Sequence, residues 1–258
     1  NKSAVNYNRD VEIFPVLKSI LEKITGSKLV YQSPTDMGVN RAGFAIIDDE
    51  VVQEAAKQEL IRRYFRYNYE HILGIEKKET VDKVKLLMEE VKIKLDDRKV
   101  VEPARRAASE PKKEQLAPEI SCGAAIELKD GKIVTGKNSL LLSSVSALVL
   151  NAIKQLADIP DKIHLLSPKI IEHIKNLKKD ILALKQETLD LEETLICLSI
   201  SSTTNPTAEV AMEKLRELEG CEVHLTHIPV AGDEAGLRRL RVNLTTDANF
   251  PTRDLFLE

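Results

Sequence analysis

The sequence predicts an α+β or α/β protein in which an N-terminal helical subdomain is followed by a three-layer α/β subdomain. Apolar residues recur at helical spacing in the first third of the chain, and short apolar runs alternate with helical patterns after residue 119. The stretch between these regions is charged, contains prolines and has few large apolar side chains. We therefore expect a helical subdomain over 1–95, a linker over 96–119 and an α/β subdomain over 120–258.

The helical subdomain opens with a capped helix. Asp10 is placed as its N-cap, and Gly26 follows its last apolar residue. A polar segment with proline and glycines then predicts an ordered loop, and two apolar stripes predict two longer helices. The expected elements are a helix over 11–24, a loop over 31–47 and helices over 49–73 and 80–94.

The α/β subdomain opens with a hairpin. Asp130-Gly131 joins apolar runs over 122–128 and 132–136, and Asp-Gly readily adopts positive φ. A helix over 139–157 is apolar on nearly every face, so we expect it to be buried. The later elements alternate, which implies some parallel strand pairing. They are strands over 164–166, 194–200, 222–228 and 242–245, and helices over 168–184, 206–219 and 233–240.

Composition excludes several classes of function. The 258 residues carry 38 Lys and Arg against 41 Asp and Glu, so no basic field favours nucleic acid, and we expect no nucleic-acid partner. The longest uncharged run, over 138–155, contains serines and asparagines and predicts a buried helix, so we expect no membrane segment. Three cysteines without C-x-x-C spacing suit reduced, buried thiols in a cytoplasmic protein.

The strongest candidate ligand site is a polar turn between an expected strand and a helix opened by Pro206. Its members are Ser201, Ser202, Thr203, Thr204 and Asn205. Free N–H groups and the helix dipole favour an anion such as phosphate, and open α/β sheets bind ligands where strands end. The alternative is a satisfied turn in which Asn205 caps the helix and the hydroxyls bond locally.

Two N-terminal segments supply further candidate ligand-binding residues. These are Thr35, Asp36, Asn40 and Arg41 in the expected loop, and Asn8 and Arg9 ahead of the first helix. The Arg41 guanidinium suits a carboxylate or phosphate, while Asp36 suits a ligand hydroxyl or Arg41 itself. The alternative is an internal Asp–Arg pair that orders the loop.

The spacing of Cys221, His224 and His227 resembles a metal-ligand pattern. In an expected strand, Cys221 and His227 point to one face and His224 points to the other. Because ligands on opposite faces do not converge on one ion, we expect no metal there.

Six segments of the chain are distinctive. They are Ala4–Asp10, Ser33–Phe44, Arg62–Tyr67, Ala124–Leu128 through Thr135–Gly136, Ala147–Lys154 and Thr204–Glu209. Together they resemble the bacterial family catalogued as domain of unknown function 1846. The resemblance implies longer proteins with an upstream α/β region that holds a glycine-rich stretch similar to a phosphate-binding loop. This chain is then expected to be the C-terminal portion. It also implies a topology similar to cytidine deaminases in the α/β subdomain, and it brings no reaction.

The deaminase-like topology does not bring deaminase chemistry. A zinc deaminase needs His or Cys with Glu at one helix start and two Cys at the next. The expected helix starts, 138–144 and 202–207, contain none of these residue types. We therefore expect the topology without zinc ligands and without deamination.

Two functional hypotheses follow from the sequence. The first is an enzyme acting on a nucleotide-like or phosphorylated small molecule, with the upstream region supplying the phosphate loop. No cofactor is evident in this portion, and a nucleotide would enter through that upstream region. The second is a non-catalytic structural or oligomerisation module. The expected partners are a second copy in a homo-oligomer, the chain's own upstream region and an anionic small molecule.

Overall fold

The computed structural model describes residues 23–24, 26, 49–109, 120–184 and 187–251. The chain divides into two compact units, Asn1–Arg98 and Lys99–Glu258. The loop expected over 31–47 and most of the helix expected over 11–24 lie outside the described residues. Among the described helices, none combines the length and the apolar composition that crossing a membrane requires.

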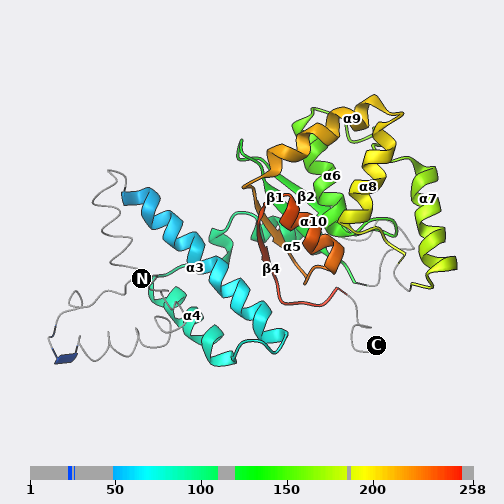
Figure 1. Cartoon of the computed structure of the whole chain (residues 1–258). Coiled ribbons are helices and arrows are strands. Elements are labelled where there is room, and N and C mark those ends of the chain that lie inside the picture. The colour runs from blue at the N-terminus through cyan, green and yellow to red at the C-terminus, as the bar shows by residue number, and fades with distance from the viewer. Residues whose placement is uncertain (1–22, 25, 27–48, 110–119, 185–186, 252–258) are drawn as a thin grey trace, which may run out of the picture. The chain divides into compact units, whose positions relative to one another are not determined.

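The first unit is helical where it is described. Helix α3 (Asp49–Ile72) and helix α4 (Lys78–Glu90) pack against each other (Figure 1), and a turn at Gly74 with φ +74° joins them. Both helices contribute fully buried side chains, such as Ile61 and Val84. A short 3₁₀ turn, η1 (Leu95–Asp97), follows. The two longer helices predicted for this region are confirmed, although α4 ends four residues earlier than predicted.

The second unit is built on a four-stranded sheet with the strand order β2-β1-β3-β4. The strands are β1 (Gly123–Glu127), β2 (Ile133–Lys137), β3 (Glu222–Leu225) and β4 (Asn243–Thr246). Strand β1 pairs antiparallel with β2 and β3, whereas β3 and β4 pair parallel. The β1–β2 hairpin turns at Gly131 with φ +82°, which confirms the hairpin predicted from Asp130-Gly131.

Helices cover both faces of the sheet. Helix α5 (Val101–Ser109) packs on one face, where Ala104 and Ala125 share a small core. Helix α6 (Ser144–Leu156) packs on the other face, and its Leu148 shares the main core with Ile126. The predicted burial of this helix is confirmed, and the second unit is a mixed α/β structure.

The remaining helices lie on the α6 side or at the ends of the sheet. They are α7 (Pro168–Asn176), continued by a π turn, η2 (Leu177–Ile181); α8 (Leu191–Ser202); α9 (Pro206–Glu213), continued by a 3₁₀ turn, η3 (Lys214–Leu218); and α10 (Ala231–Arg239). Helices α8 and α9 contribute to the main core. Helix α7 has no fully buried residue and lies beside α8 at the edge of the unit (Figure 1).

The strand predicted over 194–200 is wrong, because these residues lie within α8. A capping box starts the helix: the Asp190 carboxylate accepts from the Glu193 N–H at 2.9 Å, and the Glu193 carboxylate accepts from the Asp190 N–H at 3.0 Å. An apolar run of this length fits a buried helix as well as a strand. The capping box upstream of the run is the local signal that decides between the two.

One further prediction is corrected: residues 164–166 form no strand.

Helix α5 lies within the stretch expected as a linker over 96–119 and belongs to the second unit, while 110–119 lies outside the described residues. Helix α5 packs closely with small side chains: a Cβ on Gly123 would lie 2.2 Å from the Ala104 carbonyl oxygen. Helix α5 buries mainly alanines, whereas core elements are usually recognised in a sequence by their large apolar residues. The sequence pattern therefore did not indicate a buried helix here.

Candidate functional site

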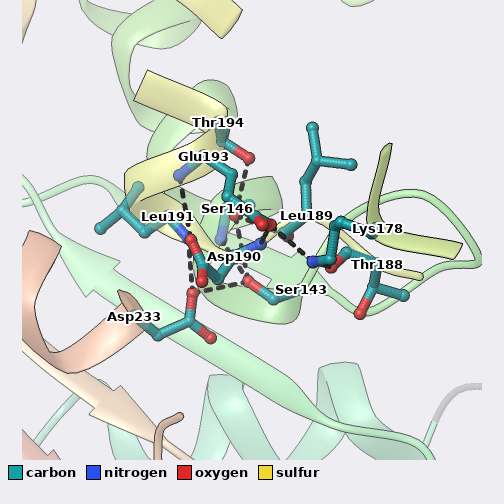
Figure 2. A network of polar contacts seen from close by, with 10 residues as sticks. All are labelled: Ser143, Ser146, Lys178, Thr188, Leu189, Asp190, Leu191, Glu193, Thr194 and Asp233. Atoms are coloured by element: carbon teal, nitrogen blue, oxygen red, sulfur yellow. Dashed lines mark hydrogen bonds and ion pairs between the residues drawn. The ribbon is translucent and has the colours of Figure 1, made fainter. Parts of the chain in front are cut away.

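Three helix N-termini of the second unit meet at a buried polar network (Figure 2). Helix α6 begins after Ser143, α8 begins after Asp190, and α10 carries Asp233 in its first turn. Strands β2 and β3 run in the same direction, because both are antiparallel to β1, and they end at one edge of the sheet. Helices α6 and α10 follow these strands, so the network lies at the edge where α/β sheets usually bind ligands.

Asp233 is the centre of this network. Its Oδ1 accepts hydrogen bonds from the Ser143 hydroxyl at 2.9 Å and from the Leu191 backbone N–H at 2.8 Å. The residue is only 1% exposed. Burial raises the pKa of its carboxyl to about 7, against the opposite effect of the two donors. A buried carboxyl group that titrates near neutral pH occurs at functional sites and in structural networks alike.

The network extends from α8 to η2 and to α6. Lys178 Nζ donates to the Glu193 carboxylate and to the Thr188 carbonyl, both at 2.7 Å. On the other side, Thr194 Oγ1 donates to Ser146 Oγ at 3.0 Å. Figure 2 shows these contacts surrounding the start of α8. The network therefore fastens the segment before α8 to three neighbouring elements.

Two more buried groups, Cys122 and His227, lie at the same edge of the sheet. Burial raises the pKa of the Cys122 thiol to about 11, and the Asp233 carboxylate adds to this shift. Burial lowers the pKa of His227 to about 4, and His224 lowers it further. The His227 Nε2 lies 3.5 Å from Ser144 Oγ, and its Nδ1 has no hydrogen-bond partner among the described residues. At neutral pH the thiol is protonated and the imidazole is neutral.

The groups at this edge are covered by protein. Asp233, Ser143, Ser144, Cys122 and His227 are each no more than 8% exposed. A substrate therefore does not reach these atoms in this conformation, and a thiol with so high a pKa is a poor nucleophile. We assign the edge a structural role.

A cavity of about 710 Å³ lies between α6 and α7. Small-molecule sites typically measure roughly 300–1,000 Å³. Its apolar lining includes Leu142, Leu150, Leu166 and Ile171. Its polar lining includes Lys154, His164, Glu172, Lys175, Lys179 and Glu187. An apolar lining with a few charged groups is typical of sites for organic ions.

The Glu187 carboxylate bridges two of the cavity lysines. It lies 3.5 Å from Lys175 Nζ and 3.3 Å from Lys179 Nζ, and Lys179 makes the larger contribution to lowering the pKa of Glu187. The third lysine, Lys154, donates to the Asp161 carbonyl at 2.9 Å. Three lysines against two glutamates leave one positive charge in excess. Because solvent-exposed ion pairs contribute only about 0–1 kcal/mol, an incoming anion can replace Glu187 at low cost.

A short ribbon separates the cavity from the polar network. Leu142, in the cavity wall, forms a parallel bridge with Leu189. The Leu189 N–H donates to the Leu141 carbonyl at 2.8 Å, and the Ser143 N–H donates to the Leu189 carbonyl at 2.9 Å. The network around Asp233 thus holds one wall of the cavity in place.

Two family models match the chain. The model described as "Domain of unknown function DUF1846, N-terminal" matches residues 1–92, and the one described as "Domain of unknown function DUF1846, C-terminal" matches residues 96–256. The chain belongs to the DUF1846 family. This confirms the family resemblance seen in the sequence, and the family descriptions assign no activity.

Similar curated proteins include several from clostridia. The DUF1846 chain is 52% identical over 256 residues to a UPF0371 protein of Clostridium botulinum (strain Alaska E43 / Type E3) and 51% identical over 256 residues to one of Clostridium tetani (strain Massachusetts / E88). Each match covers 99% of this chain and 51% of the relative. The chain therefore spans about half the length of these curated relatives.

The polar turn at 201–205 does not follow a strand in the DUF1846 chain. Ser201 and Ser202 are the last residues of α8, and Thr203 is its C-cap. Asn205 caps α9, its Oδ1 accepting from the N–H groups of Thr207 and Ala208, as the satisfied-turn alternative predicted. The Ser202 and Thr203 hydroxyls donate to carbonyls one turn earlier in α8, at 2.8 and 2.7 Å. The Thr204 backbone N–H donates a hydrogen bond to the Ser201 carbonyl. Ligand binding by these residues stays a prediction.

The other candidate residues of the DUF1846 chain fall outside the described residues. These are Asn8, Arg9, Thr35, Asp36, Asn40 and Arg41. Of the metal-like triplet, His224 lies in β3, with its Nδ1 2.9 Å from Thr245 Oγ1, while Cys221 and His227 flank the strand. Among the residues that the structure describes, no group of three or more His, Cys, Asp or Glu has a geometry suited to a metal ion.

Sequence reasoning missed both Asp233 and the cavity. Asp233 had a detectable signal, since it lies in the first turn of a helix that follows a strand and Pro229. The cavity had none, because its lining comes from α6, α7, η2 and the irregular segments at 141–142, 164–166 and 187. Such residues are brought together only by tertiary packing.

Proposed function

We propose that the second unit binds a nucleotide-like or phosphorylated small molecule in the cavity between α6 and α7, as part of a longer enzyme. The observation that carries this proposal is a cavity of suitable volume with an apolar lining and three lysines. Lysine ammonium groups bind phosphate oxygens as point charges. The leucine-rich surface accommodates the organic part of such a ligand.

The two ends of the cavity suit the two ends of this ligand. Lys175 and Lys179 are one turn apart near the C-terminal end of α7 and its π-turn continuation. His164, Leu165 and Leu166 line the cavity ahead of the first residue of α7. At a rise of about 1.5 Å per residue, roughly 10–16 Å of helix separates Pro168 from the two lysines. We assign the phosphates to the lysine end and the organic part to the histidine end.

The test is calorimetric titration of the 258-residue chain with ATP. The double variant Lys175→Gln/Lys179→Gln is expected to bind ATP at least about tenfold more weakly, because two charge-assisted contacts are lost and Glu187 is left to repel the phosphates. Lys169→Gln, on the same helix but outside the cavity lining, is the matched control and is expected to keep the affinity of the unchanged chain. Equal losses in both variants, or no ATP binding by the unchanged chain, would contradict the proposal.

We also propose that the topology of the second unit is similar to that of cytidine deaminases. The mixed sheet, with an antiparallel β1–β2 hairpin and a parallel β3–β4 pair, and the helix α6 that follows β2 support this proposal. The helices that follow β2 and β3 begin near Ser143 and Asp233. Zinc deaminases carry His or Cys ligands at such helix starts, so we propose no zinc deamination.

A second candidate function is a non-catalytic oligomerisation module. Three large apolar side chains are exposed where α7 continues into η2: Leu177 at 45%, Ile181 at 75% and Leu182 at 54%. Contiguous exposed apolar groups are typical of protein interfaces. If a second copy covers them, Ile181→Glu will shift a dimer toward monomer in sedimentation equilibrium. If Ile181→Glu and the unchanged chain have the same molecular mass in sedimentation equilibrium, this surface is not the interface.

A further inference from the structure

The connection between α8 and α9 touches the segment that forms one end of the cavity. Ser201 Oγ accepts a hydrogen bond from the Ser167 backbone N–H at 3.0 Å. Asn205 Nδ2 donates to the His164 backbone carbonyl at 3.3 Å. Ser201 is 2% exposed, so its hydroxyl is protected from competing water. Two side chains of the polar turn therefore hold both ends of the segment 164–167.

The held segment is itself irregular. It forms no helix or strand, and it places His164, Leu165 and Leu166 in the cavity lining immediately before α7 begins at Pro168. The backbone groups of such a segment lack the regular hydrogen-bond partners that a helix or a sheet provides. Side-chain hydrogen bonds then satisfy these groups and fix the position of the segment. The position of this wall therefore depends on Ser201 and Asn205.

We infer that Ser201 and Asn205 are positioning residues that fix the cavity wall for the organic part of a nucleotide-like ligand. They act through the backbone of 164–167 and do not touch the ligand. This inference rests on the function proposed above and adds selectivity to it: the lysine end binds phosphates, and the fixed wall distinguishes a nucleotide from a bare polyphosphate.

The test compares two probes, ATP and inorganic tripolyphosphate, on the full 258-residue chain. Asn205→Asp keeps the helix cap, since Asp caps as well as Asn, but it removes the amide donor to His164. Ser201→Ala removes the acceptor for the Ser167 N–H. Each variant is expected to bind ATP about three- to tenfold more weakly, the effect of one lost hydrogen bond, and tripolyphosphate equally well. Ser201→Thr keeps the hydroxyl and is expected to restore ATP affinity.

The outcomes separate this inference from the function on which it rests. ATP affinity unchanged in both variants, or equal losses for ATP and tripolyphosphate, overturns the positioning role while the cavity remains a binding site. If the unchanged chain binds neither probe, the proposed function and this inference both fall. Faster amide hydrogen exchange at Ser167 in free Ser201→Ala provides a second supporting readout, because it reports on the wall without any ligand.

Discussion

Gly136→Ala is expected to destabilise the second unit by about 3 kcal/mol, the upper part of the range for overpacked cores. Gly136 lies in β2 beneath α6, and an added Cβ would lie 2.3 Å from the Leu148 N and 2.5 Å from the Ser144 carbonyl oxygen. These are backbone atoms of a helix, so no side-chain rotation relieves the clash. The sheet and α6 must therefore move apart, and packing contacts in the main core between them are lost.

Urea unfolding followed by circular dichroism measures this change. Thr135→Ala is the matched control, since Thr135 is the neighbouring strand residue and is exposed. It is expected to cost at most about 1 kcal/mol, the span of strand propensities. A Gly136→Ala midpoint equal to that of the control would show that α6 does not pack this closely on β2.

Asp233→Asn is expected to change how stability depends on pH. The Asp233 pKa is raised to about 7 in the folded chain from 3.8, so the folded state binds more protons than the unfolded state between these values. Its contribution to stability is fully present below pH 3.8 and is lost as pH rises through 7. The shift corresponds to roughly 4 kcal/mol at 1.36 kcal/mol per pKa unit.

His227 acts in the opposite direction. Its pKa is lowered to about 4 from 6.5, so the unfolded state binds more protons in this window and stability increases with pH by about 3 kcal/mol. The two groups therefore nearly cancel between pH 4 and 6.5 in the unchanged chain. When one of the two residues is replaced, the dependence of the unfolding free energy on pH that the other residue causes becomes measurable.

Unfolding free energies measured from pH 4.5 to 8.5 by urea titration test this balance, with the pH range chosen as roughly the window between the cited pKa values. Asp233→Asn should gain stability as pH rises to about 6.5, and should exceed the unchanged chain at pH 8 by up to about 4 kcal/mol. His227→Gln should lose stability over the same range. Parallel pH profiles for all three proteins would show that Asp233 and His227 do not titrate as their burial requires.

Much of the fold could be predicted from the sequence where local chemistry is explicit. Asp130-Gly131 identified the hairpin, the uniformly apolar pattern identified α6 as buried, and Asn205-Pro206 marked the start of α9. The error at α8 has a local cause: the apolar run at 195–200 is compatible with a strand and with a helix, and the capping box at Asp190 and Glu193 is what distinguishes the two.

The candidate site was less accessible to sequence reasoning. The sequence is compatible with a ligand site and with a satisfied turn at 201–205. Neither interpretation predicts that Ser201 and Asn205 bond to the backbone of a segment about 35–40 residues away, at Ser167 and His164. The charged stretch from Lys175 to Lys185 has the pattern of a solvated helix face. The placement of Lys175, Lys179 and Glu187 around one cavity follows from the packing of α7 near α6, which no local pattern encodes.

A crystal structure of the chain with a non-hydrolysable ATP analogue tests the central claim most directly. The account predicts the analogue between α6 and α7, with phosphate oxygens about 3 Å from the Lys175 and Lys179 Nζ atoms and the base against His164 and Leu166. An analogue bound elsewhere on the chain, with Glu187 still bridging both lysines, would contradict it.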